Sequence, residues 1–186
     1  MSIQLISISP LYDVGAKFRE LLLEFEREAK CKCGLPWVLV TERSRTVKLR
    51  DRILWKTLLI EGVFSHRRGV TVCPRKLKVK AKFSLSELPL TVIRVPRKPS
   101  LPPPDQPPLR EITERILKFI NGLKLTCMCG EKWVNLIPED RRAKYTNLLV
   151  VKKVRVRSLF AHPSKTYCTR KFKIDIEVKL SEIGVV

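Results

Sequence analysis

The feature that most constrains this chain is a pattern of cysteine, histidine and tryptophan that occurs twice. Cys31, Cys33, Gly34, Trp37, Phe64 and His66 return 96 positions later as Cys127, Cys129, Gly130, Trp133, Phe160 and His162. After a one-residue deletion, Cys73, Arg75, Lys76, Ser86 and Glu87 return 95 positions later as Cys168, Arg170, Lys171, Ser181 and Glu182. Rare residue types in one order with a single register change indicate a tandem repeat of a module of roughly 70 to 80 residues.

A proline-rich stretch separates the two halves. Seven of the 13 prolines fall between Pro96 and Pro108. Closely spaced prolines favour extended polyproline II, so we expect a semi-rigid spacer that holds the halves apart. The predicted organisation is a first module over residues 1–95, a linker over 96–108 and a second module over 109–186.

Each half shows the same order of hydrophobic patterns. Helical spacing of apolar residues is followed by a short strand at the first tryptophan, a longer strand, and a last strand in which apolar residues alternate with charged ones. This order predicts an α+β fold made of two copies, each a helix on a three- to four-stranded antiparallel sheet stapled by one zinc ion. The predicted elements are helices over 16–30 and 109–123, and strands over 37–40, 53–64, 76–85, 133–137, 148–160 and 171–179.

The six cysteines and two histidines divide as three Cys and one His per half. Three cysteines cannot all pair within a module, whereas Cys3His fills a tetrahedral zinc site. The predicted zinc ligands are Cys31, Cys33, His66 and Cys73 in one site and Cys127, Cys129, His162 and Cys168 in the other. Disulfides, buried thiols and an iron–sulfur or redox site remain alternatives.

The same pattern argues against an enzyme. A catalytic zinc needs an open coordination position and a general base, and neither half repeats a Glu or Asp beside the ligands. A Cys–His nucleophile pair is disfavoured because four potential ligands recur together.

The charge of the chain points to a polyanionic partner. With 38 Lys and Arg against 18 Asp and Glu, the formal net charge is +20. Nucleic acid neutralises such a charge best, and an anionic membrane or an acidic protein comes second. No apolar run is long enough to cross a bilayer and no signal peptide is recognisable, so we expect an intracellular protein of the cytoplasm or nucleoid, or one carried in a virion. Only two Gln and three Asn occur, which favours a hyperthermophilic archaeon or its virus as the source.

Basic side chains at alternate strand positions are suited to a phosphate backbone. Residues i and i+2 of a strand lie about 6.6 to 7 Å apart, close to the spacing of successive phosphates. An alternative interpretation is that edge lysines only prevent aggregation. The residues predicted to contact nucleic acid are Arg43, Arg45, Lys48, Arg50, Arg67, Arg68, Lys76, Lys78, Lys80, Lys82, Arg141, Arg142, Lys144, Lys153, Arg155, Arg157, Lys171 and Lys173.

Aromatic residues make up 7% of the chain, which disfavours a platform that stacks single-stranded bases. We interpret Trp37 and Trp133 as core residues, because a tryptophan just beyond a metal-binding turn commonly anchors the core. The sequence therefore predicts a protein that binds double-stranded DNA through its backbone, for packaging or as an architectural protein. The alternatives are a sequence-specific regulator whose two modules imitate a dimer, or a structural protein of a virion or ribonucleoprotein.

Overall fold

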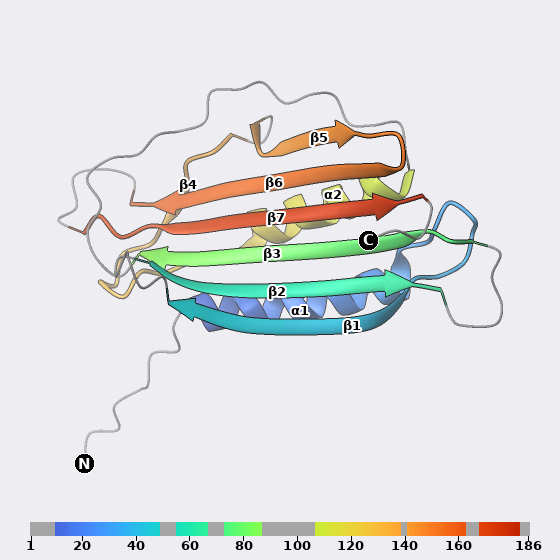
Figure 1. The fold of residues 1–186 in the computed structure, drawn as a ribbon. Helices are drawn as coiled ribbons and strands as arrows, with labels where there is room; N and C mark the ends of the chain where they lie inside the picture. The colour runs from blue at the N-terminus through green and yellow to red at the C-terminus, as the bar shows by residue number, and fades with distance from the viewer. Residues whose placement is uncertain are drawn as a thin grey trace, which may run out of the picture.

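The computed structural model describes residues 10–48, 55–66, 73–86, 107–138, 141–162 and 168–182 (Figure 1). Within these residues, two helices and seven strands follow one another in an α+β arrangement. In chain order they are α1 (Pro10–Glu28), β1 (Val38–Lys48), β2 (Trp55–Ser65), β3 (Lys76–Ser86), α2 (Pro107–Gly122), β4 (Val134–Asn135), β5 (Ala143–Asn147), β6 (Val151–Ala161) and β7 (Phe172–Ser181).

All strands belong to one antiparallel sheet with the order β1-β2-β3-β7-β6-β4, and β5 also pairs with β6. Both helices lie on the same face, α1 behind the first half of the sheet and α2 behind the second (Figure 1). The opposite face carries no helix of the described residues, and we call it the open sheet face.

Helix α1 begins at Pro10, six residues before the predicted start, because proline is well suited to the first turn of a helix. Most of its apolar side chains, including Phe18 and Phe25, are buried against the sheet, whereas Leu23 is 47% exposed. Gly15 allows the close approach of helix and sheet, since a Cβ there would lie 2.5 Å from a methyl group of Leu58. Neither helix of the described residues has the length and apolarity needed to cross a membrane.

The predicted alternation in the last strand of each half is confirmed. On β3 the buried apolar side chains are Leu77, Val79, Ala81, Phe83 and Leu85, and on β7 they are Phe172, Ile174, Ile176, Val178 and Leu180. These residues face the helices and form one core with them, so the intervening lysines fall on the open sheet face.

The prediction that the two halves stand apart is wrong. Strand β3 of the first half pairs with β7 of the second over ten residue pairs, from Lys76–Ser181 to Leu85–Phe172. Two amphipathic last strands with unpaired backbone groups satisfy these groups by pairing with each other. The linker over 96–108 lies largely outside the described residues, which resume at Pro107.

The pairing of β3 with β7 has a pseudo-twofold symmetry. Ala81 pairs with Ile176, which is its own counterpart 95 residues later. Under the same shift of 95 residues, Lys80 corresponds to Asp175 and Lys82 corresponds to Glu177. The pairs Lys80–Glu177 and Lys82–Asp175 are therefore counterparts of each other. A pseudo-twofold axis therefore crosses the sheet between Ala81 and Ile176.

The outer strands of the two halves differ. Strand β1 runs over 11 residues, far beyond the predicted strand at 37–40, whereas the second half has the two-residue β4 and the five-residue β5. Pro138 follows β4 and has no N–H with which to continue the ladder.

Candidate metal centres and a basic sheet face

Each half begins its Cys/His cluster in a tight turn after the helix. In the first half, the N–H of Gly34 donates to the carbonyl of Cys31 at 2.8 Å, and Gly34 has a φ of 87°. In the second half, Gly130 has a φ of 90° and donates to Cys127 at 2.9 Å. Glycine adopts this left-handed conformation without strain, so the Cys-x-Cys-Gly spacing fixes the turn.

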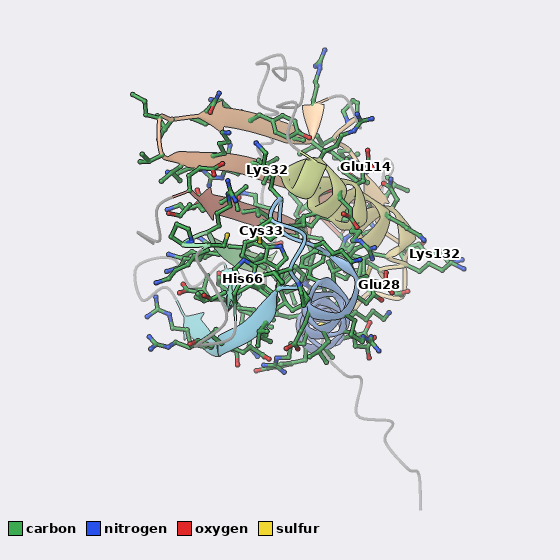
Figure 2. All side chains as sticks on the ribbon, turned by 90° about the vertical axis from the view of Figure 1, so that its right-hand side faces the viewer. Glu28, Lys32, Cys33, His66, Glu114 and Lys132 are labelled. Atoms are coloured by element: carbon green, nitrogen blue, oxygen red, sulfur yellow. The ribbon has the colours of Figure 1, made fainter. Side chains whose placement is uncertain are left out.

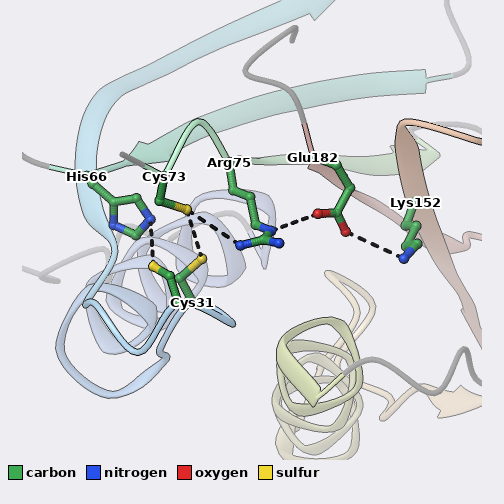
Figure 3. Close-up of polar contacts among 7 residues, drawn as sticks. Cys31, His66, Cys73, Arg75, Lys152 and Glu182 are labelled. Atoms are coloured by element: carbon green, nitrogen blue, oxygen red, sulfur yellow. Dashed lines mark hydrogen bonds and ion pairs between the residues drawn. The ribbon is translucent and has the colours of Figure 1, made fainter. Parts of the chain in front are cut away.

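The first cluster lies at the end of the sheet where β2 ends and β3 begins. His66 follows β2 and Cys73 precedes β3, so neighbouring strands bring both to the turn that carries Cys31 and Cys33 (Figures 2 and 3). The Sγ atoms of Cys31 and Cys73 are 3.9 Å apart, and Sγ of Cys33 is 3.6 Å from Nε2 of His66. All four ligand atoms lie within 4.8 Å of one another.

The second cluster repeats this geometry at the opposite end of the sheet, where β6 ends and β7 begins. The Sγ atoms of Cys127 and Cys168 are 3.6 Å apart, and Sγ of Cys129 is 3.4 Å from Nε2 of His162. Both predicted ligand sets are thus brought together, each within 4.8 Å.

These spacings fit a tetrahedral metal ion. Bonds of about 2.3 Å to sulfur and 2.0 Å to nitrogen place two sulfurs about 3.8 Å apart, and a sulfur and a nitrogen about 3.5 Å apart. A disulfide would bring two sulfurs to about 2.05 Å, and all six cysteines are free. Each cluster can therefore hold one metal ion.

The histidines are oriented for ligation through Nε2. Nδ1 of His66 lies 3.0 Å from the carbonyl oxygen of Pro36, and Nδ1 of His162 lies 3.3 Å from that of Lys132. A proton on Nδ1 donated to a carbonyl leaves the lone pair of Nε2 for a metal, the usual outer contact of a metal-binding histidine.

Within each cluster the buried and the less buried thiols differ in pKa. Burial raises the pKa of Cys31 to about 11 and that of Cys127 to about 12. Burial also acts on Cys73, but a hydrogen bond from the backbone of Arg75 and contacts with the other ligands lower its pKa to about 7. At Cys168 burial is again outweighed by contacts of this kind, which lower the pKa to about 6. In each cluster the half-buried thiol, Cys73 or Cys168, therefore ionises more readily than the buried one.

Arg75 connects the first cluster to the second half of the chain (Figure 3). Its Nη1 lies 3.7 Å from Sγ of Cys73, while its Nε donates to Glu182 at 2.7 Å. Glu182 also accepts from Nζ of Lys152 at 3.5 Å. Burial opposes ionisation of Glu182, but Arg75 and Lys152 hold the pKa of its carboxyl below the ordinary value. Arg170 makes the matching contact to Cys168 at 3.7 Å.

The open sheet face gathers the basic side chains of both halves into transverse rows. One row crosses six strands in register and contains Arg43, Glu61, Lys80, Glu177, Arg155 and Lys144. The next row contains Arg45, Leu59, Lys82, Asp175 and Arg157. In both rows the ends are basic and the acidic residues lie between them.

Charge differs sharply between the two layers. The described charged residues of the open sheet face are Arg43, Arg45, Lys76, Lys78, Lys80, Lys82, Lys144, Lys153, Arg155, Arg157, Lys173 and Lys179, with Glu61, Asp175 and Glu177, a net charge of +9. Helices α1 and α2 carry seven acidic and six basic residues, a net charge of −1. Figure 2 shows two of these acids, Glu28 and Glu114, on the helical side.

The predicted lysine ladder on β3 lies on this face, but part of it is neutralised. Nζ of Lys78 is 2.9 Å and Nζ of Lys80 is 3.5 Å from the carboxylate of Glu61 on the adjacent β2. Burial opposes ionisation of Glu61, but these ammonium groups hold its pKa below the ordinary value. Arg43, Arg45, Leu59, Glu61 and Lys80 contribute to the lining of a hollow of about 860 Å³ beside the ladder.

Several predicted nucleic-acid contacts are placed differently. Arg142 is buried, and its guanidinium donates to the carbonyl of Ile137 at 3.0 Å and to Asn121, so it supports the turn before β5 rather than facing solvent. Lys171 is also buried, at 5% exposure, because it lies beside Ser86 at the end of the sheet. Both are corrections to the predicted set.

The other predicted residues away from the open sheet face, and one residue that was not predicted, are placed as follows. Arg141 is exposed in the turn before β5. The nucleic-acid contacts predicted at Arg50, Arg67 and Arg68, and at the side chain of Lys48, lie outside the described residues. Lys179 lies on the open sheet face and was missed, although the alternation of β7 already placed it with Lys173.

Comparison of the chain with protein-family models, with curated proteins and with solved structures finds no match. The function of the chain therefore has to be inferred from the chemistry of its sites.

Proposed function

We propose that this protein binds nucleic acid, specifically duplex DNA, on the open sheet face, and that it is not an enzyme. The observation that carries the proposal is the difference in charge between the layers, +9 on the open sheet face against −1 on the helices. A chain that only needed solubility would gain nothing from placing 12 basic residues and only three acidic ones on one face of its sheet. A polyanion laid across that face releases counterions from many phosphates at once.

Duplex DNA suits this face better than a single strand. Single-strand binders stack bases on aromatic side chains, and the open-face positions with described side chains carry no Phe, Tyr or Trp on strands β1, β2, β3, β6 and β7. Trp37 and Trp133 are buried at 0% and 6% exposure, as expected for core residues. Affinity is therefore assigned to phosphate contacts with weak sequence preference, as in packaging or architectural proteins.

We assign zinc to the two Cys3His clusters. Three sulfurs and one imidazole nitrogen at tetrahedral spacing form the donor set of structural zinc sites. A bound ion would connect the turn after the helix to the end of one strand and the start of the next, β2 and β3 in the first half and β6 and β7 in the second. A site filled by four protein ligands has no open position for a substrate. We therefore assign the zinc ions a structural role, in which metal binding stabilises the fold.

We further propose that the two halves are copies of one module, with boundaries at residues 1–95 and 109–186. The glycine turn, the ligand distances and the symmetric pairing of β3 with β7 support duplication. Two copies joined edge to edge build a binding face larger than either half can offer.

Titration of duplex DNA against two matched variants tests the proposed function. A sheet-face variant, Arg43→Ala/Arg45→Ala/Lys144→Ala, removes three cations from the open sheet face, and a helix-layer variant, Lys17→Ala/Arg110→Ala/Lys118→Ala, removes three from the helices. Removal of each phosphate contact should reduce the slope of log affinity against log salt by about 0.9. We expect a shallower slope for the sheet-face variant only. Equal reductions in both variants would show that binding follows net charge and not this face.

Duplex RNA and single-stranded DNA, titrated in the same salt series, test the choice of partner. We expect duplex DNA to bind most tightly. Tighter binding of either competitor would remove the duplex DNA assignment while leaving the open sheet face as the site.

A further inference from the structure

The pseudo-twofold axis leaves the open sheet face at a point of balanced charge. Lys80 lies opposite Glu177, and Lys82 lies opposite Asp175, on the two strands that flank the axis. A phosphate placed on the axis would meet two carboxylates as well as two ammonium groups. The centre of the face is therefore a poor position for a DNA backbone.

Strand β3 carries only lysines as charged residues on the open sheet face, but Glu61 partly neutralises them, and the other strands whose open-face charges are all basic lie farther from the axis, on both sides. We call Arg43 and Arg45 on β1 the first stripe, and Lys144 on β5 with Arg155 and Arg157 on β6 the second stripe. Strands β1 and β6 are four strand spacings apart, which is about 19 Å. The hollow of about 860 Å³ lies along the first stripe and leaves room for a backbone there.

The second stripe keeps a positive charge although it contacts an acid of β7. Nε of Arg155 donates to Asp175 at 2.8 Å, and Nε of Arg157 lies 3.6 Å from the same carboxylate. Two guanidinium groups thus share one negative charge, and both arginine side chains remain nearly half exposed, at 45% and 46%. Their remaining N–H groups can donate to phosphate oxygens.

These dimensions match two backbones rather than one. The major groove of B-DNA is about 12 Å wide between the surfaces of its bordering backbones, and about 3 Å of phosphate on each side places the phosphorus atoms about 18 Å apart. The carboxylates of Asp175 and Glu177 would then lie over the groove, away from phosphates. Duplex DNA also has local twofold axes that exchange its antiparallel strands, as the axis of this protein exchanges its halves.

We propose that a duplex docks with one of its local twofold axes on the pseudo-twofold axis of the protein, so that each stripe holds a different strand. This inference rests on the proposed binding of duplex DNA to the open sheet face. It adds that each half of the chain serves one strand of the duplex, although the two stripes lie on different elements, β1 in the first half and β5 with β6 in the second.

Photo-crosslinking of the full chain to a duplex whose strands carry different fluorophores tests this arrangement. A chain with both Arg43→p-benzoylphenylalanine and Arg157→p-benzoylphenylalanine has one crosslinker in each stripe. We expect a denaturing gel to show an adduct that contains both colours. A control pair at Arg43 and Arg45 lies within one stripe and should lose the two-colour adduct while keeping the one-colour adducts.

The outcomes separate this inference from the function on which it rests. One-colour adducts alone from the two-stripe chain would mean that both stripes follow one strand, which overturns the inference and keeps the binding face. A third chain with crosslinkers at Lys17 and Lys118 on the helices should give no adduct. If it labels DNA as well as the other two chains, or if none does, the proposed function fails and the inference fails with it.

Discussion

The two Cys/His clusters have the same ligands but different surroundings. His66 is 8% exposed and stacks on Trp37 with ring centres 4.9 Å apart and planes 12° from parallel. His162 is only half-buried, and its ring lies 6.0 Å from that of Trp133 at 39°. Local sequence thus sets the ligand geometry, while the packing around it sets how well each cluster is protected from solvent.

The tryptophans account for part of this difference. Nε1 of Trp133 donates to the carbonyl of Arg170 at 3.1 Å, and the ring also packs on Phe172 at 6.0 Å. These two contacts favour a tilted ring. The buried Nε1 of Trp37 makes no hydrogen bond within the described structure, and its ring lies flat on His66 instead. The repeated tryptophan therefore packs on the histidine in the first half, whereas in the second half it contacts residues around the start of β7.

Removal of one ligand from either cluster should have the largest effect. Cys31→Ala and Cys127→Ala each break one site, so we expect metal analysis to give one zinc per chain in place of two. Each substitution should cost about 4 kcal/mol at zinc concentrations a thousandfold above the Kd. Thermal unfolding should show the greater destabilisation for Cys31→Ala, because His66 and Trp37 are the more deeply buried pair. Equal destabilisation would mean that burial around the ligands does not separate the clusters.

The two clusters should release their metal ions to a chelator at different rates. The histidine of the second cluster is more exposed, so a chelator should reach that cluster first. We therefore expect metal release in two phases whose rates differ about tenfold, which corresponds to a difference of about 1.4 kcal/mol in the activation free energy of release. The Cys127→Ala variant should lack the fast phase, whereas Cys31→Ala should lack the slow one. A single phase in the parent protein would contradict the difference in protection.

The ion pairs around Glu182 should have the smallest effect. Glu182→Gln leaves Arg75 and Lys152 without their carboxylate and should cost about 1 kcal/mol, or about 2 to 4 °C in Tm. The folded-state pKa of Glu182 is lowered, so its stabilisation is present above the ordinary value of 4.5 and is lost as pH falls through the lower, folded-state value. The difference in Tm between parent and variant should therefore shrink in acid.

The matched control for this prediction is Glu114→Gln, which removes an exposed carboxylate paired with Arg110 within α2. It should change Tm by less than Glu182→Gln at neutral pH. Metal release from the first cluster should be faster only in Glu182→Gln, since Arg75 contacts Cys73. An unchanged release rate would show that the ion pairs stabilise the fold without reaching the metal site.

The candidate metal ligands could be predicted from sequence alone, but the nucleic-acid face only in part. Cys and His are rare, and their recurrence with Gly34 and Gly130 identified eight residues that the fold brings together. Lys and Arg are abundant, and their side chains are long enough to serve several roles. Arg142 is therefore buried in a turn, and Lys78 is paired with Glu61, although neither fact is visible in strand periodicity.

The sequence by itself determined the helices, the alternation of the last strands and the two ligand sets, because these depend on side chains close along the chain or on rare residue types that recur. Only the tertiary structure decided that β3 pairs with β7, which makes one sheet of two halves and sends the clusters to opposite ends. Strand pairing uses backbone N–H and C=O groups that every residue other than proline carries, so two amphipathic edges give no side-chain signal of which strand will join them. The charge balance around Ala81 and Ile176 follows from that register, since a shift by two residues would place different side chains opposite one another.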